Sequence, residues 1–151
     1  MVMFYRLLED SKAIYIVQEV GGSKSLSEFV REGKDKRLTE NEARPLFRQL
    51  VSGMRYLHKL HVCHRDLKLT NILIDDDVNL KLIDFGFSAI GNGIFKTYCG
   101  TPSYMAPELV KKLEYSGKAV DIWAIGVILY KMVTGDYPFG SNFFGLLKKN
   151  R

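Results

Sequence analysis

Four short segments in a fixed order constrain this chain more than any other feature of its sequence. They are HRDLKLTN at residues 64–71, DFG at 84–86, APE at 106–108 and DIWAIG at 121–126. A single tripeptide match arises by chance in many chains, whereas all four in this order and at these spacings do not. The fold must therefore bring together a loop rich in polar side chains, a second aspartate and a largely apolar segment.

Local signals place helices around these segments. Thr39 and Glu42 have the spacing of a capping box, so a helix is expected to begin there. It then carries apolar residues at three- and four-residue intervals, which predicts one buried face as far as about Leu60. Residues 118–133 predict a second helix that is apolar nearly all round and therefore buried on most sides.

Strands are expected in two pairs. Residues 3–8 and 13–19 are apolar runs joined by a polar turn, and residues 71–74 and 79–83 flank three consecutive aspartates. We expect the second pair to form a small hairpin whose end presents Asp84.

Together the four segments resemble the catalytic half of a eukaryotic protein kinase. The sequences HRDLK and GTPSYMAPE resemble the serine/threonine class, and the activation segment is similar to those of calcium/calmodulin-dependent or AMP-activated kinases. The resemblance implies an α+β, protein-kinase-like fold with a mainly helical large lobe and only the last strands of the small lobe. Residues 1–20 are then the remnant of the small lobe, ending at the start of the hinge, and residues 21–151 an incomplete large lobe.

The resemblance assigns roles to residues of the catalytic loop and the DFG segment. Asp66 would accept or orient the proton of a substrate hydroxyl, and Lys68 would face the transferring phosphate. Asn71 and Asp84 would hold Mg²⁺, which prefers hard oxygen ligands. Thr101, in the activation segment, is expected to contact Asp66 and Lys68.

The nucleotide site and a regulatory site are implied in the same way. ATP would bind the hinge backbone at Glu19 and Gly21, beside Gln18 as gatekeeper, with Leu73 under the adenine.

Arg65 would pair with a phosphate on the activation segment, because a guanidinium binds anions in a bidentate manner. Thr97 is the candidate phosphosite, with Tyr98 as its nearest competitor, which implies an upstream activating kinase. Asp121 resembles the buried aspartate that anchors the catalytic loop.

The net charge, the cysteine count and the N-terminal residues limit which partners and which cell compartment are expected. The net charge is +5, but the basic residues are dispersed, so neither a nucleic-acid nor a membrane partner is expected. Two cysteines do not make a disulfide framework, and residues 1–10 do not read as a signal peptide, which predicts a cytoplasmic protein with a nuclear location left open. His58, His61 and His64 lie close together in sequence, but no second Cys/His pair stands at zinc-ligand spacing, so a zinc site is not expected.

Two functions from different classes remain open. The first is a protein serine/threonine kinase that transfers the γ-phosphate of ATP to protein substrates, present here as a partial catalytic domain. The second is a truncated, non-catalytic protein that serves as a binding partner or scaffold. Residues 1–63 contain neither the glycine-rich phosphate loop nor the strand lysine of the family. We therefore expect the 151-residue chain alone to be weakly active or inactive.

Overall fold

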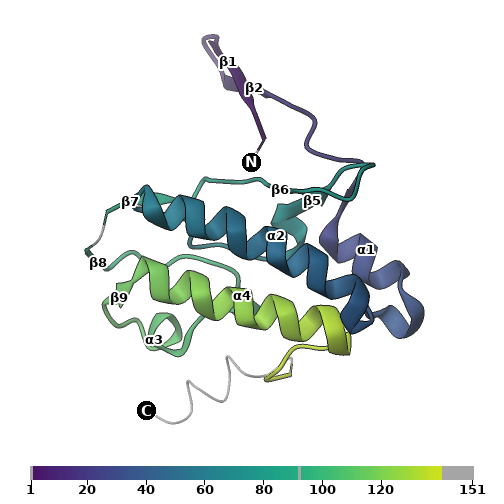
Figure 1. Cartoon of the computed structure of the whole chain (residues 1–151). Helices are drawn as coiled ribbons and strands as arrows, with labels where there is room; N and C mark the ends of the chain where they lie inside the picture. The colour runs from purple at the N-terminus through teal and green to yellow at the C-terminus, as the bar shows by residue number, and fades with distance from the viewer. Residues whose placement is uncertain (1, 92, 141–151) are drawn as a thin grey trace.

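The computed structural model describes residues 2–91 and 93–140, which form an α+β fold built on two long helices (Figure 1). In chain order the elements are β1 (Phe4–Glu9), β2 (Ile14–Gln18), β3 (Lys24–Ser25), α1 (Leu26–Glu32), the 3₁₀ turn η1 (Lys34–Lys36), α2 (Glu40–Lys59), β4 (Val62–Cys63), η2 (Leu69–Asn71), β5 (Ile72–Ile74), β6 (Leu80–Leu82), β7 (Ala89–Ile90), β8 (Ile94–Phe95), η3 (Pro102–Tyr104), α3 (Pro107–Val110), β9 (Tyr115–Ser116) and α4 (Gly117–Thr134). The predicted α+β class is confirmed. The proposed division at residue 20 stays a prediction, and residues 141–151 lie outside the described residues.

Helices α2 and α4 lie side by side and run in opposite directions (Figure 1). The predicted capping box opens α2: the Thr39 hydroxyl accepts a hydrogen bond from the Glu42 backbone N–H, and Glu42 Oε2 accepts one from Thr39 N at 2.8 Å. The helix ends at its C-cap, Leu60. Most of the predicted apolar face is buried, and the buried residues are Ala43, Leu46, Leu50, Met54 and Leu57. Val51, which the pattern placed on the same face, is 41% exposed.

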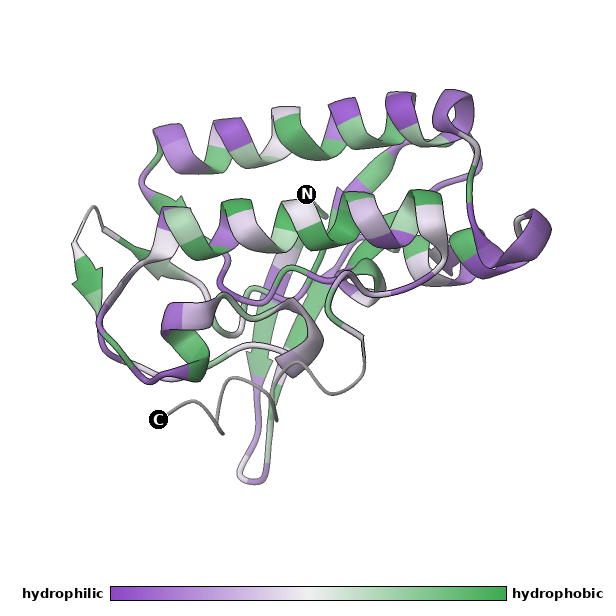
Figure 2. Ribbon diagram, turned by 90° about the horizontal axis from the view of Figure 1, so that it is seen from below, coloured by the Kyte–Doolittle hydropathy of each residue, from purple (hydrophilic) through white to green (hydrophobic). Residues whose placement is uncertain are grey.

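The prediction that the second helix is buried on most sides is only partly right. Val120, Ala124 and Ile128 of α4 are buried in the core. On the opposite side, however, Ile122 is 59% exposed and Tyr130 is 42% exposed. Figure 2 shows hydrophobic segments along the length of this helix, and with Ile122 and Tyr130 exposed an apolar stripe faces outward in the described structure.

The predicted hairpin forms the middle and edge of a small antiparallel sheet with the order β3-β5-β6. Ile72 pairs with Leu82 and Ile74 with Leu80. Asp75 closes the turn between β5 and β6, because its Oδ1 accepts hydrogen bonds from the backbone N–H of Asp77 and of Asn79. This sheet carries the chain from Asn71 through to Asp84.

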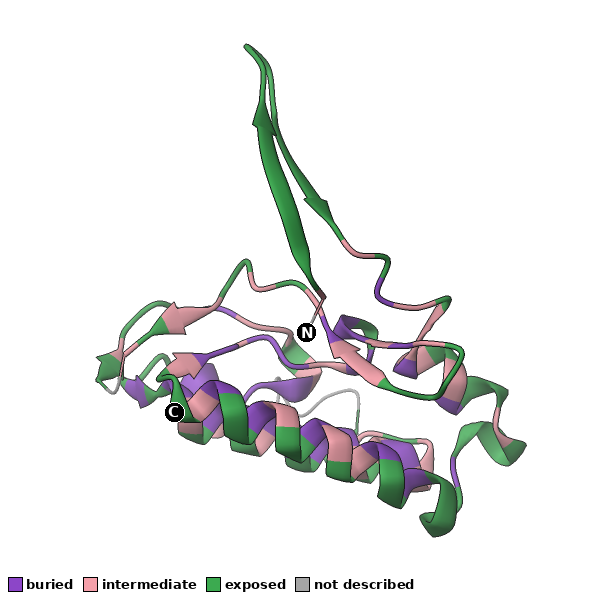
Figure 3. Ribbon diagram, turned by 45° about the horizontal axis from the view of Figure 1, so that its top comes forward, coloured by how far each residue is buried: buried purple, intermediate pink, exposed green. Residues whose placement is uncertain are grey.

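Strands β1 and β2 form a separate antiparallel hairpin that projects away from the rest of the fold (Figure 3). All of its strand residues are exposed, among them Phe4, Leu7 and Ile16. Of the helices in residues 2–91 and 93–140, none combines the length and the apolar character that crossing a bilayer requires.

Candidate active site

The catalytic loop follows α2 and β4 and is held from behind by one carboxylate. Asp121, on α4, is 1% exposed, and its two oxygens accept the backbone N–H groups of His64 at 2.9 Å and Arg65 at 2.8 Å. Arg65 has a φ of 65°, a left-handed conformation that is unfavourable for a residue with a side chain. The anchoring contact expected of Asp121 is therefore present, and it fixes the backbone immediately before Asp66.

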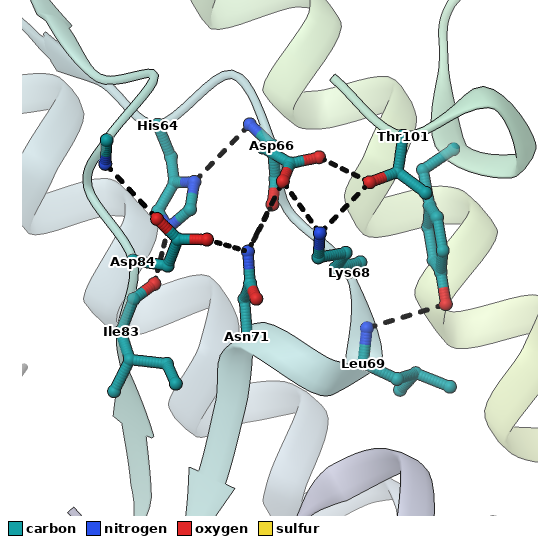
Figure 4. A network of polar contacts seen from close by, with 10 residues as sticks. His64, Asp66, Lys68, Leu69, Asn71, Ile83, Asp84 and Thr101 are labelled. Carbon is teal, nitrogen blue, oxygen red and sulfur yellow. Dashed lines mark hydrogen bonds and ion pairs between the residues drawn. The ribbon is translucent and has the colours of Figure 1, made fainter.

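Asp66, Lys68 and Thr101 form a closed triangle of polar contacts (Figure 4). Lys68 Nζ lies 2.9 Å from Asp66 Oδ2 and 3.1 Å from Thr101 Oγ1, and the Thr101 hydroxyl donates to Asp66 Oδ1 at 2.7 Å. Asp66 is 5% exposed, whereas the Lys68 side chain is 24% exposed. A carboxylate and an ammonium group are thus fixed next to each other, with solvent access on the lysine side. Thr101 contacts both Asp66 and Lys68, as predicted.

The two predicted metal ligands also lie together. Asn71 Nδ2 is 3.4 Å from Asp84 Oδ2 and donates to the backbone carbonyl of Asp66 at 3.1 Å. Because its nitrogen is engaged there, the amide oxygen of Asn71 is the atom that can bind a cation. A carboxylate and an amide oxygen fit Mg²⁺, which usually takes one or two protein groups besides substrate phosphates.

His64 joins the catalytic loop to the strand that ends at Asp84. Its ring is fully buried, and its Nε2 lies 3.1 Å from the carbonyl oxygen of Ile83. The backbone N–H of Asp66 points to the other ring nitrogen, Nδ1, at 3.4 Å, so Nε2 carries the hydrogen. The ring also packs against Phe85, with ring centroids 5.0 Å apart. The catalytic and metal-binding segments are therefore positioned as one unit.

Of the four predicted nucleotide residues, Gly21 and Leu73 lie next to each other, whereas Gln18 is exposed at the end of β2. A methyl group built on Gly21 would lie 2.9 Å from Leu73 Cδ1, so the hinge glycine directly adjoins the predicted adenine floor. The Glu19 side chain forms an ion pair with Lys81 of β6. This hydrogen bond lowers the pKa of Glu19 and raises that of Lys81.

One neighbour at the hinge was not predicted. A methyl group on Gly21 would also lie 2.6 Å from Val2 Cγ1, which means that the Val2 side chain packs beside Gly21 and Leu73. No sequence signal marks this contact, since it depends on where the chain that precedes β1 turns.

Arg65 and the activation segment meet through Tyr115. Arg65 donates from Nε to the Phe87 carbonyl at 2.7 Å and from an amino group to the Tyr115 hydroxyl at 3.2 Å. Tyr115 in turn donates to the carbonyl oxygen of Thr97 at 2.8 Å. The Thr97 residue itself is exposed, and the Arg65 guanidinium lies 4.9 Å from the Phe95 ring centroid.

Two tyrosines near the site were missed as functional residues. Tyr115 is 3% exposed, and burial raises the pKa of its hydroxyl. Tyr104 accepts a hydrogen bond from the Leu69 backbone N–H at 3.4 Å, and burial raises its pKa strongly. The sequence shows only that each tyrosine lies in or near the activation segment. Their partners, Arg65 for Tyr115 and Leu69 for Tyr104, lie far away in sequence.

A strained catalytic loop anchored by a buried aspartate, a lysine beside its carboxylate, and an asparagine next to a DFG aspartate define a phosphotransferase site of the protein kinase class. The sequence model of the protein kinase domain matches residues 1–146. The chain belongs to the eukaryotic protein kinase family, serine/threonine class.

Known relatives agree with this assignment. The chain is 40% identical to the probable serine/threonine-protein kinase MARK-A of Dictyostelium discoideum over 98% of its own length and 14% of that protein. It is 43% identical to human NUAK family SNF1-like kinase 1 over 91% of its length and 21% of the relative. It is 46% identical to the CBL-interacting serine/threonine-protein kinase 8 of Arabidopsis thaliana over 91% of its length and 31% of that protein. The chain thus spans less than a third of each of these relatives, and the AMP-kinase-like resemblance is confirmed.

Proposed function

We propose that this chain carries the catalytic core of an ATP-dependent protein serine/threonine kinase, which transfers the γ-phosphate of ATP to a Ser or Thr hydroxyl of a protein substrate. The observation that carries the proposal is the triangle of Asp66, Lys68 and Thr101 beside the Asn71–Asp84 pair. Phosphoryl transfer needs chiefly positioning and compensation of negative charge, and this arrangement offers both.

Each side chain has a distinct task in this proposal. Asp66 orients the substrate hydroxyl and receives its proton, since its Oδ1 already accepts a hydroxyl hydrogen from Thr101 at 2.7 Å. Lys68 holds positive charge next to the same carboxylate. Asn71 and Asp84 would hold Mg²⁺. When bound, ATP and Mg²⁺ supply the phosphoryl group and neutralise its negative charge.

The test is a transfer assay on the 151-residue chain with γ-labelled ATP, Mg²⁺ and a peptide mixture containing Ser, Thr and Tyr acceptors. We expect weak label on Ser and Thr, since residues 1–63 contain neither the glycine-rich loop nor the strand lysine, and this label should disappear in the Asp66→Ala variant. Label confined to Tyr, or label that the Asp66→Ala variant still produces at the same rate, would contradict the proposal.

We also propose that phosphorylation of Thr97 by an upstream kinase regulates the site. Thr97 is exposed, and its backbone is already linked to Arg65 through the Tyr115 hydroxyl, so a phosphate there would have a guanidinium nearby. Treatment with an activating serine/threonine kinase should raise the transfer rate of the wild type and not that of Thr97→Ala. Equal activation of a Tyr98→Phe variant separates Thr97 from its neighbour.

The second candidate function, a non-catalytic binding protein, is favoured by one observation. Val2 packs against Gly21 and Leu73, where the adenine would lie. An apolar side chain in this place competes with the nucleotide for the same floor. The assay above distinguishes the two functions, because a binding protein yields no label with any acceptor.

A further inference from the structure

We infer that His58 is a positioning residue for the catalytic loop and acts through Asp121. His58 Nε2 lies 2.9 Å from Asp121 Oδ2, and the same carboxylate binds the backbone of the catalytic loop. The inference deepens the proposed kinase function and rests on it for its catalytic consequence. The structural part, which concerns the loop itself, can be measured without any activity.

The donors around Asp121 are shared between its two oxygens. Oδ1 accepts the N–H of Arg65 at 2.8 Å, and Oδ2 accepts both the N–H of His64 and the Nε2–H of His58 at 2.9 Å. A carboxylate that is 1% exposed is costly to bury unless hydrogen bonds satisfy it. His58 is the side-chain donor in this set, whereas the other two are the backbone groups that the carboxylate must hold in place.

Without His58 the Asp121 carboxylate would lose one of the hydrogen bonds that fix its orientation. The terminal torsion of an aspartate is soft, so its oxygens are aligned chiefly by their partners. The backbone that depends on this alignment is strained, because Arg65 has a φ of 65° and such a conformation persists only where its surroundings enforce it. Asp66 is the next residue, so a relaxed Arg65 would displace the carboxylate that orients the substrate.

His58 is held by α2 and can also be reached from a groove on the surface. It stands in the last turn of α2, which is fixed by its buried face, and its side chain is 15% exposed. It lines a groove of about 620 Å³ between α2 and α4, together with Lys118 and Ile122. A small molecule can therefore reach the position of the ring from outside, and this allows a rescue experiment.

The experiment compares His58→Ala, His58→Leu and His58→Gln with the wild-type chain by amide hydrogen exchange. We expect exchange at the His64 and Arg65 amides to be about tenfold faster in the Ala and Leu variants relative to the Leu50 amide in α2, since a hydrogen bond to a charged group is lost. Gln, which retains an N–H donor, should keep exchange within about threefold of the wild type. Imidazole added to His58→Ala should slow exchange at the same two amides.

A matched control is His61→Asn, which changes an exposed histidine of the same groove. His61 has a φ of 60°, a conformation that asparagine tolerates, so the backbone is preserved. This variant should exchange like the wild type. In the transfer assay, His58→Ala should lower kcat about tenfold and leave KM for ATP unchanged, because His58 is not among the residues placed at the nucleotide site.

Three results would overturn the inference. One is unchanged exchange at the His64 and Arg65 amides in both His58→Ala and His58→Leu. Another is equal acceleration at Leu50, which indicates general loss of stability, and the third is failure of both Gln and imidazole to restore protection. If the wild type transfers no phosphate, the proposed kinase function fails, while the exchange data still decide the role of His58.

Discussion

The Thr101 hydroxyl donates to Asp66 Oδ1 at 2.7 Å across 35 residues of sequence. This contact ties the activation segment to the residue proposed to orient the substrate. It also shows that the Asp66 carboxylate can accept a hydrogen bond from an aliphatic hydroxyl, which is the group that a Ser or Thr substrate would present. The first prediction follows from this pair.

Asp66→Asn should lower the transfer rate by at least about 100-fold, because the amide can no longer receive a proton. Thr101→Val removes the hydroxyl while retaining the shape of the side chain, and should lower the rate about tenfold. Thr101→Ser keeps the hydroxyl and should remain close to the wild type. Initial rates with a serine peptide, measured at saturating ATP, check all three.

Thr70→Val is the matched control for Thr101→Val. Thr70 is an exposed threonine in η2, on the catalytic loop that also carries Asp66, and its loss should leave the rate unchanged. A Thr101→Val variant with wild-type activity would show that the contact with Asp66 has no catalytic importance.

Asp84→Asn should raise the Mg²⁺ concentration needed for half-maximal transfer by about tenfold or more, since a charged ligand is replaced by a neutral one. The measurement is a Mg²⁺ titration of the transfer rate at fixed ATP, and removal of the metal with EDTA should stop transfer in the wild type. Asp76→Asn, in the exposed turn between β5 and β6, should behave as the wild type. An unchanged Mg²⁺ requirement in Asp84→Asn would exclude Asp84 as a ligand.

The local elements were predictable wherever a short-range signal defines them. The Thr39–Glu42 capping box predicted the start of α2 because both partners lie within one helical turn. The same pattern occurs at Ser25 and Glu28, where the structure has a capping box that opens α1. This helix was missed because it is only seven residues long and offers too few apolar positions for a clear helical period.

The site was predictable to the extent that its residues lie within the four ordered segments. Asp66, Lys68 and Asn71 share one loop, so their proximity follows from their spacing. The contacts of Tyr115 with Arg65 and of Val2 with Gly21 arise from tertiary packing between segments far apart in sequence. Neither pattern nor composition defines such pairs. The role inferred for His58 likewise depends on a contact with Asp121, which lies 63 residues away in sequence.

Val2→Ser should raise the affinity for nucleotide about tenfold. The half-buried Val2 side chain lies beside Gly21, which also adjoins Leu73, and a small polar residue there would lose the free energy that comes from burying the valine methyl groups. Binding of a fluorescent ATP analogue provides the measurement. Val78→Ser, at an exposed valine in the turn between β5 and β6, is the control, and an affinity unchanged by Val2→Ser would show that Val2 does not compete with the nucleotide.

The cap of α2 should make a measurable and pH-dependent contribution to stability. Thr39→Ala should lower the free energy of unfolding by about 1 kcal/mol, because Glu42 N then has no side-chain acceptor. The hydrogen bond from the Thr39 side chain is the main cause that lowers the pKa of Glu42 below its usual value of 4.5.

A group whose pKa is lower in the folded state stabilises the fold above its unfolded pKa and loses that effect as the pH falls through the folded value. The stability difference between the wild type and Glu42→Ala should therefore be constant above about pH 5 and shrink as the pH is lowered below 4.5. Urea unfolding followed by circular dichroism between pH 3 and pH 7 would measure it. Glu40→Ala, which removes another acidic residue of the same turn and its ion pair with Arg44 but leaves the capping box intact, is the comparison variant. A difference that persists undiminished at pH 3 would mean that Glu42 stabilises α2 without its charge.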